Sequence, residues 1–247
     1  MHIKHCLALM CALCFSPNLV WSQEIHAGHD AHNPQDHRHG AERYHAFTLE
    51  TDYGGSEHGA LVRWDLDGWI GTDENKLWLK AEGEKAQGTT ESAEFWALYS
   101  RNVSEFWDVQ AGLRHDSQPH PTSYGVLGLQ GLLPLFFETQ AHVFVSDEGD
   151  VSARVHTETD LLVTQRLILQ PHAEINLFAQ DVPEQDVGAG LSNGEIGVQT
   201  RYELSRQFAP YMDFTYERAF GETSAIAKRE EGDNDNAIVS VGLRVMF

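Results

Sequence analysis

From residue 44 to residue 247 the chain repeats one pattern, in which apolar and polar side chains alternate along segments of about ten residues. Leu77 and Leu79, for example, alternate with Lys76 and Lys80. A period of two puts the apolar side chains on one face of a β-strand and the polar ones on the other. No long stretch of this region has the 3.6-residue apolar period of an amphipathic helix. The region is therefore predicted to be all β.

Turn-rich joints divide this region into twelve predicted strands, which is an even number. Five joints are short, whereas others, such as 181–192 and 221–236, are long, acidic and rich in Gly. Short connections at one rim and longer ones at the other are typical of outer-membrane barrels, and strands of this length cross a bilayer when they are tilted. The predicted strands are 44–53, 60–70, 75–84, 91–101, 106–116, 122–132, 136–146, 151–162, 167–179, 193–203, 209–220 and 237–247, and the short joints are 71–74, 102–105, 133–135, 163–166 and 204–208.

Alternation alone does not separate a membrane barrel from a soluble periplasmic β-sandwich, which turns its apolar face inward. The even strand count, the alternating joints and the last segment, 237–247, favour the barrel, because that segment is apolar at every second residue up to Phe247. A closed barrel also leaves no unpaired backbone edge in lipid. The predicted fold is a closed antiparallel transmembrane β-barrel of about 12 strands over 44–247. The mean hydropathy of −0.38 is compatible with it, because only alternate residues face lipid.

Residues 1–22 are predicted to be a secretory signal peptide. Lys4 supplies the positive start, 7–15 the apolar run, and Val20-Trp21-Ser22 the cleavage site. The apolar run is too short to span a bilayer as a helix. All three cysteines lie in this peptide, so the mature chain is predicted to have no disulfide and no thiolate metal ligand.

Residues 23–43 form a low-complexity stretch with almost no large apolar side chains, which predicts a segment that is disordered when free. Imidazoles bind Cu(II), Zn and Ni well, and a flexible tract lets several of them converge on one ion. The segment is therefore predicted to bind metal, although it could also serve as a plain linker. Its candidate ligands are His26, His29, His32, His37 and His39.

A second candidate metal site is predicted on the polar, inward side of three consecutive strands. Counted from the short-turn rim, three histidines stand at similar heights there, and neighbouring strands are about 4.8 Å apart. They could therefore share one ion with the carboxylates beside them. The alternative is that these groups only pair with one another inside a hydrated lumen. The residues are His142, His156 and His172, with Glu138, Glu158 and Glu174.

The rest of the inward face is predicted to carry charges of both signs, of which the acidic ones would favour a cation in the lumen. These residues are Arg63, Asp65, Asp67, Lys80, Glu82, Arg114, Asp213, Glu217 and Arg244.

Short motifs spread over 44–247 resemble the copper resistance protein B family of Gram-negative bacteria. They occur in order along the whole region, which makes the resemblance specific. The motifs are Trp64-Asp65, Gly68-Trp69-Ile70-Gly71, Asn75-Lys76-Leu77-Trp78-Leu79-Lys80, Glu82-Gly83-Glu84, Leu98-Tyr99-Ser100-Arg101, Phe106-Trp107-Asp108, Gln110-Ala111-Gly112, Gly128, Gln130-Gly131-Leu132, Asp160-Leu161-Leu162, Thr164-Gln165-Arg166-Leu167-Ile168-Leu169-Gln170-Pro171 and Phe208-Ala209-Pro210-Tyr211.

The resemblance implies an outer-membrane barrel that protects cells from excess copper and acts beside a periplasmic multicopper oxidase or copper carrier. Family members often carry Met together with His in the N-terminal tract, whereas 23–43 contains no Met. Thioether ligands for Cu(I) are therefore scarce, which favours His-ligated Cu(II), with Zn as the alternative ion.

The remaining function classes are poorly supported by the sequence. With 17 Lys and Arg against 37 Asp and Glu, the net charge of −20 argues against nucleic-acid binding. The sequence has no HExxH motif and no Gly-rich phosphate loop, and its cysteines leave with the signal peptide, so no enzyme activity is predicted. The expected function is copper binding and copper resistance, by export through or sequestration at the outer membrane, with the N-terminal segment in the periplasm. The alternative is a general porin-like channel with an incidental His-rich tail.

Overall fold

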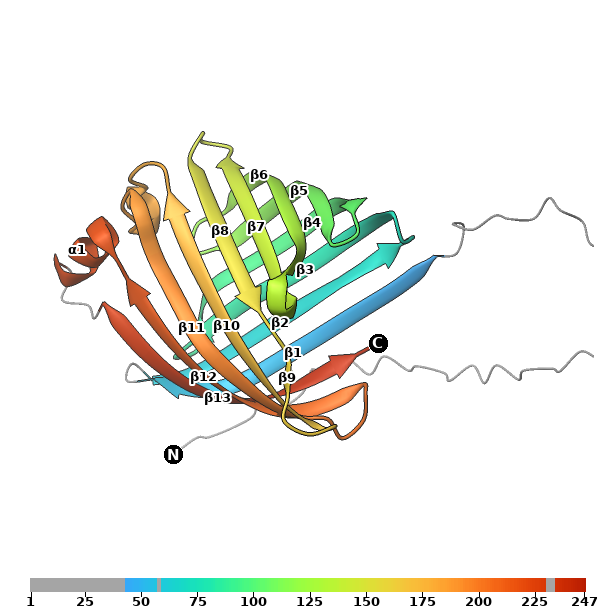
Figure 1. Ribbon diagram of the computed structural model, residues 1–247. Helices are drawn as coiled ribbons and strands as arrows, with labels where there is room; N and C mark the ends of the chain where they lie inside the picture. Colours follow the sequence, from blue (N-terminus) through green and yellow to red (C-terminus); the bar gives the residue numbers. More distant parts are fainter. Residues whose placement is uncertain (1–42, 57–58, 230–233) are drawn as a thin grey trace, which may run out of the picture. The chain divides into compact units, whose positions relative to one another are not determined.

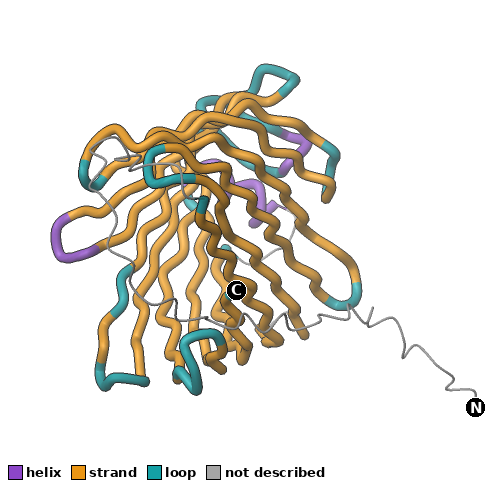
Figure 2. The backbone as a smooth tube through the Cα atoms, turned by 90° about the vertical axis from the view of Figure 1, so that its right-hand side faces the viewer, coloured by secondary structure: helices purple, strands orange, loops and turns teal. Residues whose placement is uncertain are grey.

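The chain forms a closed antiparallel barrel (Figures 1 and 2). The computed structural model describes residues 43–56, 59–229 and 234–247, so the predicted signal peptide and nearly all of the His-rich segment lie outside the described residues. Successive strands pair with one another, except that β8 and β9 both pair with β10. The pairings of β1 with β13 and of β10 with β11 complete the ring. The strands are β1 (Tyr44–Ser56), β2 (Gly59–Gly71), β3 (Asn75–Ala86), β4 (Thr89–Ser104), β5 (Trp107–Gln118), β6 (Thr122–Leu133), β7 (Phe137–Ser146), β8 (Val151–Glu158), β9 (Leu161–Leu162), β10 (Leu167–Phe178), β11 (Gly190–Tyr202), β12 (Phe208–Ala219) and β13 (Asp235–Met246).

The predicted count of twelve strands is confirmed, although the predicted strand 151–162 is divided into β8 and the two-residue β9. Both pieces pair with β10, so together they fill one position in the ring. The chain leaves the ladder at the two residues between them. Thr159 Oγ1 donates to the carbonyl oxygen of Phe136 at 3.2 Å, and the carboxylate of Asp160 pairs with Arg201.

The prediction of longer connections around one rim is only partly correct. The connections after β10 (179–189) and after β12 (220–234) are long, and the second contains helix α1 (Gly221–Arg229). After β3, in contrast, only Gln87 and Gly88 separate the strands. Both residues have positive φ, 50° and 91°, as a two-residue hairpin turn requires, so the strands run closer to the rim than the sequence suggested.

The outer surface of the strands is apolar, which fits a barrel that faces lipid. Leu113, Leu127 and Ile196 expose 67%, 66% and 62% of their surface, while their neighbours along each strand are less exposed. So wide an apolar surface is unfavourable in water but suits the hydrocarbon core of a bilayer. Among the described residues, no helix is long and apolar enough to cross a membrane.

The inward face is packed unevenly. Along β4, β6 and β7 it holds a hydrophobic core of Trp96, Leu98, Tyr124, Val126 and Phe144. The rings of Trp96 and Phe144 meet edge to face, with centroids 5.2 Å apart. This side of the barrel is therefore partly filled with side chains, and the cavity that remains still reaches Trp96 on β4 and His142 on β7.

A glycine lets the ring of His142 lie flat on the wall beside this core. Gly128 on β6 is the direct ladder partner of His142 on β7. A Cβ atom at Gly128 would stand 2.2 Å from Cδ2 of His142 and 2.9 Å from the carbonyl oxygen of Ala141. The position of the imidazole thus depends on the absence of a side chain across the ladder.

We predict that Gly128→Ala destabilises the barrel by about 1–3 kcal/mol, because the added methyl group must displace the buried imidazole or the backbone. The midpoint of urea unfolding in detergent measures the effect. Gly125→Ala on the same strand is the matched control, since its Cβ would meet only the carbonyl oxygen of Val145, at 4.0 Å. Equal midpoints for the two variants would contradict the prediction.

Candidate metal-binding lumen

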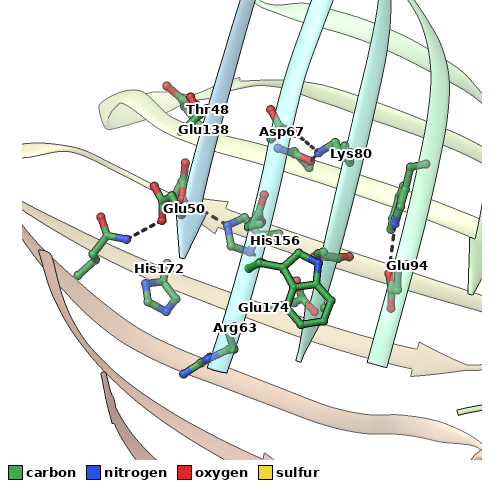
Figure 3. Close-up of a pocket in the computed structure, with 18 of the residues that line it drawn as sticks. Thr48, Glu50, Arg63, Asp67, Lys80, Glu94, Glu138, His156, His172 and Glu174 are labelled. Atoms are coloured by element: carbon green, nitrogen blue, oxygen red, sulfur yellow. Dashed lines mark hydrogen bonds and ion pairs between the residues drawn. The ribbon is translucent and has the colours of Figure 1, made fainter. Parts of the chain in front are cut away.

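The open part of the interior is a strongly acidic cavity of about 610 Å³ (Figure 3). Among the described residues that line it, thirteen are carboxylates, four are Lys or Arg, and three are His. Such a lining lowers the energy of a cation in the lumen. The carboxylates are Glu50, Asp52, Asp65, Asp67, Glu82, Glu84, Glu94, Glu138, Glu158, Glu174, Glu195, Asp213 and Glu217; the basic residues are Arg63, Lys80, Arg154 and Arg244.

The residues predicted to face inward do so. All of them line the cavity except Arg114, whose guanidinium pairs with Glu94 at 2.7 Å and with Asp116 at 2.6 Å inside the packed side of the barrel. The parity of the strands was therefore readable from the sequence.

One group of three lumen residues has the spacing of a metal site. His156 on β8, Glu174 on β10 and Glu195 on β11 each offer one ligand atom, and these atoms lie within 4.8 Å of one another. The ladder explains the grouping, because His156 pairs directly with Glu174, and Glu174 pairs directly with Glu195. The Nδ1 atom of His156 lies 3.5 Å from Oε2 of Glu174. One imidazole and two carboxylates are suitable ligands for Cu(II) or Zn.

Next to this group, a second histidine faces a different carboxylate. His172 on β10 is the direct ladder partner of Glu158, and its Nδ1 atom lies 4.0 Å from Oδ1 of Asp213 on β12. Gly197 leaves room for its ring, since a Cβ there would stand 2.4 Å from Nε2 of His172. Glu158 in turn lies 3.5 Å from Nε2 of His156. The second histidine is thus near the first group without being a member of it.

The third predicted histidine also lines the cavity, but its contacts are with the packed side of the barrel. His142 is only 3% exposed, its Nε2 atom lies 2.8 Å from Oε1 of Gln110 on β5, and its ring meets Trp96 edge to face at 5.3 Å. It therefore belongs to the packed side of the barrel. Glu138 lines the cavity and is the ladder partner of Glu158.

The sequence predicted that the three histidines stand at similar heights, whereas the structure offsets them along the strands. His142 pairs with Arg154, whereas His156 pairs with Gln140, so the two are offset by two residues along β7 and β8. The same offset separates His156 from His172, which pairs with Glu158. The cause is the stagger of strands in a closed barrel, which counting from the turns does not capture.

Glu195 was not among the predicted ligands. Its inward parity was visible in the sequence, but its height was not. The connection 179–189 separates β10 from β11, and the register shifts at a bulge between Asn176 and Leu177. No local signal in the sequence fixes that register. The candidate ligands of the predicted N-terminal tract, His26, His29, His32, His37 and His39, lie outside the described residues.

Solved structures share this barrel fold at low sequence identity. The KdgM porin matches with a TM-score of 0.53 and 11% identity, over 81% of this chain and 99% of that chain. The NanC porin matches with a TM-score of 0.57 and 12% identity, over 80% of this chain and 98% of that chain. These likenesses concern the fold.

Sequence relatives identify the family. The copper resistance protein B homolog of Pseudomonas syringae pv. tomato is 38% identical over 223 residues, which are 90% of this chain and 74% of the relative. Copper resistance protein B of Escherichia coli is 41% identical over 186 residues, 74% of this chain, and the match spans only 62% of that relative's length. The model of the copper resistance protein B precursor (CopB) family matches residues 43–247. The barrel fold and these relatives together support an outer-membrane location. The chain therefore belongs to the copper resistance protein B family.

Proposed function

We propose that this protein binds copper ions at the outer membrane and thereby contributes to copper resistance, either by passing the ions outward through the lumen or by holding them at the membrane. The observation that carries the proposal is the group of His156, Glu174 and Glu195 within an acidic lumen, in a chain whose family is named for copper resistance. An imidazole and two carboxylates hold Cu(II) more readily than Cu(I), which prefers thiolate and thioether ligands.

The two candidate binding regions have complementary roles in this proposal. The tract 23–43 captures ions in the periplasm, where a flexible segment can collect them from solution or from a periplasmic multicopper oxidase or copper carrier. The lumen then attracts the captured ion, because its carboxylates outnumber its fixed cations. Zn is the competing ion, but the same ligands bind Cu(II) more tightly.

A general porin-like channel remains the second candidate, because the solved porins share the fold. The packed side of the barrel and the salt bridges inside it favour the copper-specific function, since they reduce the space for an uncharged solute.

We predict that the lumen group binds one Cu(II) ion. To isolate it, the full mature chain carries Gln at each of the five histidines of the tract 23–43. In that background His156→Ala or Glu195→Gln should weaken Cu(II) binding at least about tenfold, equivalent to about 1.4 kcal/mol, in a calorimetric titration in detergent.

Two controls accompany this titration. His115→Ala removes an exposed imidazole whose Nδ1 atom lies 3.0 Å from Oγ of Ser123, outside the group, and should leave the affinity unchanged. His142→Ala tests the arrangement predicted from the sequence. A loss as large as that of His156→Ala would show that three histidines share the ion, which the geometry of the lumen group does not support.

We also predict that the tract 23–43 binds copper separately from the lumen. Replacing its five histidines by Gln, with the lumen unchanged, should lower the copper content of the purified mature protein by at least one ion per chain, because a flexible tract loses its imidazole ligands together. Elemental analysis after gel filtration measures the content. An unchanged copper content would mean that the tract is only a linker.

Transport is tested with proteoliposomes loaded with Cu(II) and with an uncharged sugar of similar hydrated size. Copper should leave faster than the sugar, because the acidic lumen concentrates cations. Tight binding without copper release would identify sequestration as the mechanism. Equal release of both solutes would favour the porin-like channel and contradict the proposal.

A further inference from the structure

One arginine joins opposite walls of the barrel. Arg154 projects from β8, and its Nη1 atom donates to Oε1 of Glu82 on β3 at 2.7 Å. Its Nη2 atom donates to Oε1 of Glu94 on β4 at 3.1 Å. Four positions of the ring, β4 to β7, lie between β3 and β8, so these contacts cross the interior and do not follow the wall. We call Arg154 with Glu82 and Glu94 the cross-lumen bridge.

A second contact crosses the interior beside the bridge. The Nζ atom of Lys80 on β3 donates to Oε1 of Gln140 on β7 at 2.6 Å, and it also pairs with Asp67 at 3.0 Å (Figure 3). The aromatic core lies on the same side, since the Arg154 guanidinium stands 5.5 Å from the ring centroid of Trp96. Together these side chains cross the lumen between β3 and β8 and narrow it there.

The bridge also touches the candidate copper site. The Nε atom of Arg154 lies 3.4 Å from Oε1 of Glu174, while Oε2 of the same carboxylate lies 3.5 Å from Nδ1 of His156. Glu174 is therefore shared between a fixed cation and a candidate metal ligand. A stronger contact between Glu174 and Arg154 therefore leaves less negative charge on the carboxylate for an ion bound at His156, and the reverse also holds.

We propose that Arg154 determines which cations the lumen accepts, because its guanidinium is a tethered cation that competes with an incoming ion for the charge of Glu174. A divalent ion held by His156, Glu174 and Glu195 draws charge from Glu174 and repels the guanidinium, which weakens the bridge. A monovalent ion provides less attraction and less repulsion, so it leaves the bridge in place. The inference about copper rests on the proposed function, whereas the narrowing of the lumen by the bridge does not.

The first test measures potassium conductance through single barrels in a planar bilayer. Arg154→Met should raise the conductance severalfold, because it removes the contacts that cross and narrow the lumen. The matched control is Arg244→Met, which removes the same charge from the same cavity. Arg244 pairs at 3.0 Å with Glu50 on the adjacent β1 and does not cross the interior, and its side chain is 21% exposed against 18% for Arg154. An unchanged conductance in Arg154→Met, or an equal rise in both variants, overturns the proposal that the cross-lumen bridge limits passage of ions.

The second test measures Cu(II) affinity in the background without the five tract histidines. Arg154→Met should bind Cu(II) severalfold more tightly, since Glu174 loses its competing cation, while Arg244→Met should change the affinity much less. If the background protein with Arg154 and its Arg154→Met variant bind Cu(II) with equal affinity, the competition at Glu174 is overturned. If the background protein with Arg154 binds no copper, the proposed copper site in the lumen fails. The conductance test still decides whether the bridge narrows the lumen.

Removing Arg154 takes a cation from three carboxylates, of which Glu94 keeps Arg114, and the loss of these pairs can prevent folding. The double variant Arg154→Met with Glu82→Gln removes one charge of each sign and breaks the bridge at both ends. It should show the same rise in conductance. A folded double variant with the wild-type conductance overturns the proposal.

Discussion

Lipid outside the barrel is the constraint on which the other features depend. In hydrocarbon every backbone N–H and C=O group must be paired within the protein, so the strands must close into a ring. In the closed sheet, successive side chains of each strand point alternately outward and inward. The apolar ones face outward to lipid, and most of the charged strand residues face the lumen. A chain with a net charge of −20 can therefore span a membrane, because its charged side chains need not contact lipid.

Confinement of charge gives the interior two unlike sides. On one side Arg114, Arg154 and Lys80 neutralise carboxylates beside an aromatic core. On the other side the carboxylates of β10, β11 and β12 stand next to one another with few cations among them. The first side resembles the interior of a soluble protein, and the second resembles an ion pathway. Arg154 contacts both sides, through Glu94 on one and Glu174 on the other.

The sequence predicted those properties that depend on parity and failed at those that depend on register. Period-two alternation was enough to place His156, Glu174 and Asp213 inside the barrel and to count its strands. It could not place Glu195 beside Glu174, because a long connection and a bulge lie between their strands. The partners of Arg154 were equally hidden, since Glu82 lies 72 positions away along the chain, on a strand that is not adjacent. The sequence also missed one tight hairpin turn, at Gln87 and Gly88, because these residues are not the usual Asn-Gly or Asp-Gly pair.

The seam between β1 and β13 has a consequence for assembly. It joins the first described strand to the last, with Thr48 opposite Met246, and the backbones of Phe47 and Phe247 exchange hydrogen bonds at 2.9 Å in both directions. Their rings stack beside it, with centroids 5.9 Å apart. Contacts so distant in sequence form slowly, because all the intervening strands must first be ordered. Until then both strands have unpaired edges that can recruit another copy of the chain. Completion of this one pairing therefore separates an inserted barrel from an aggregating intermediate.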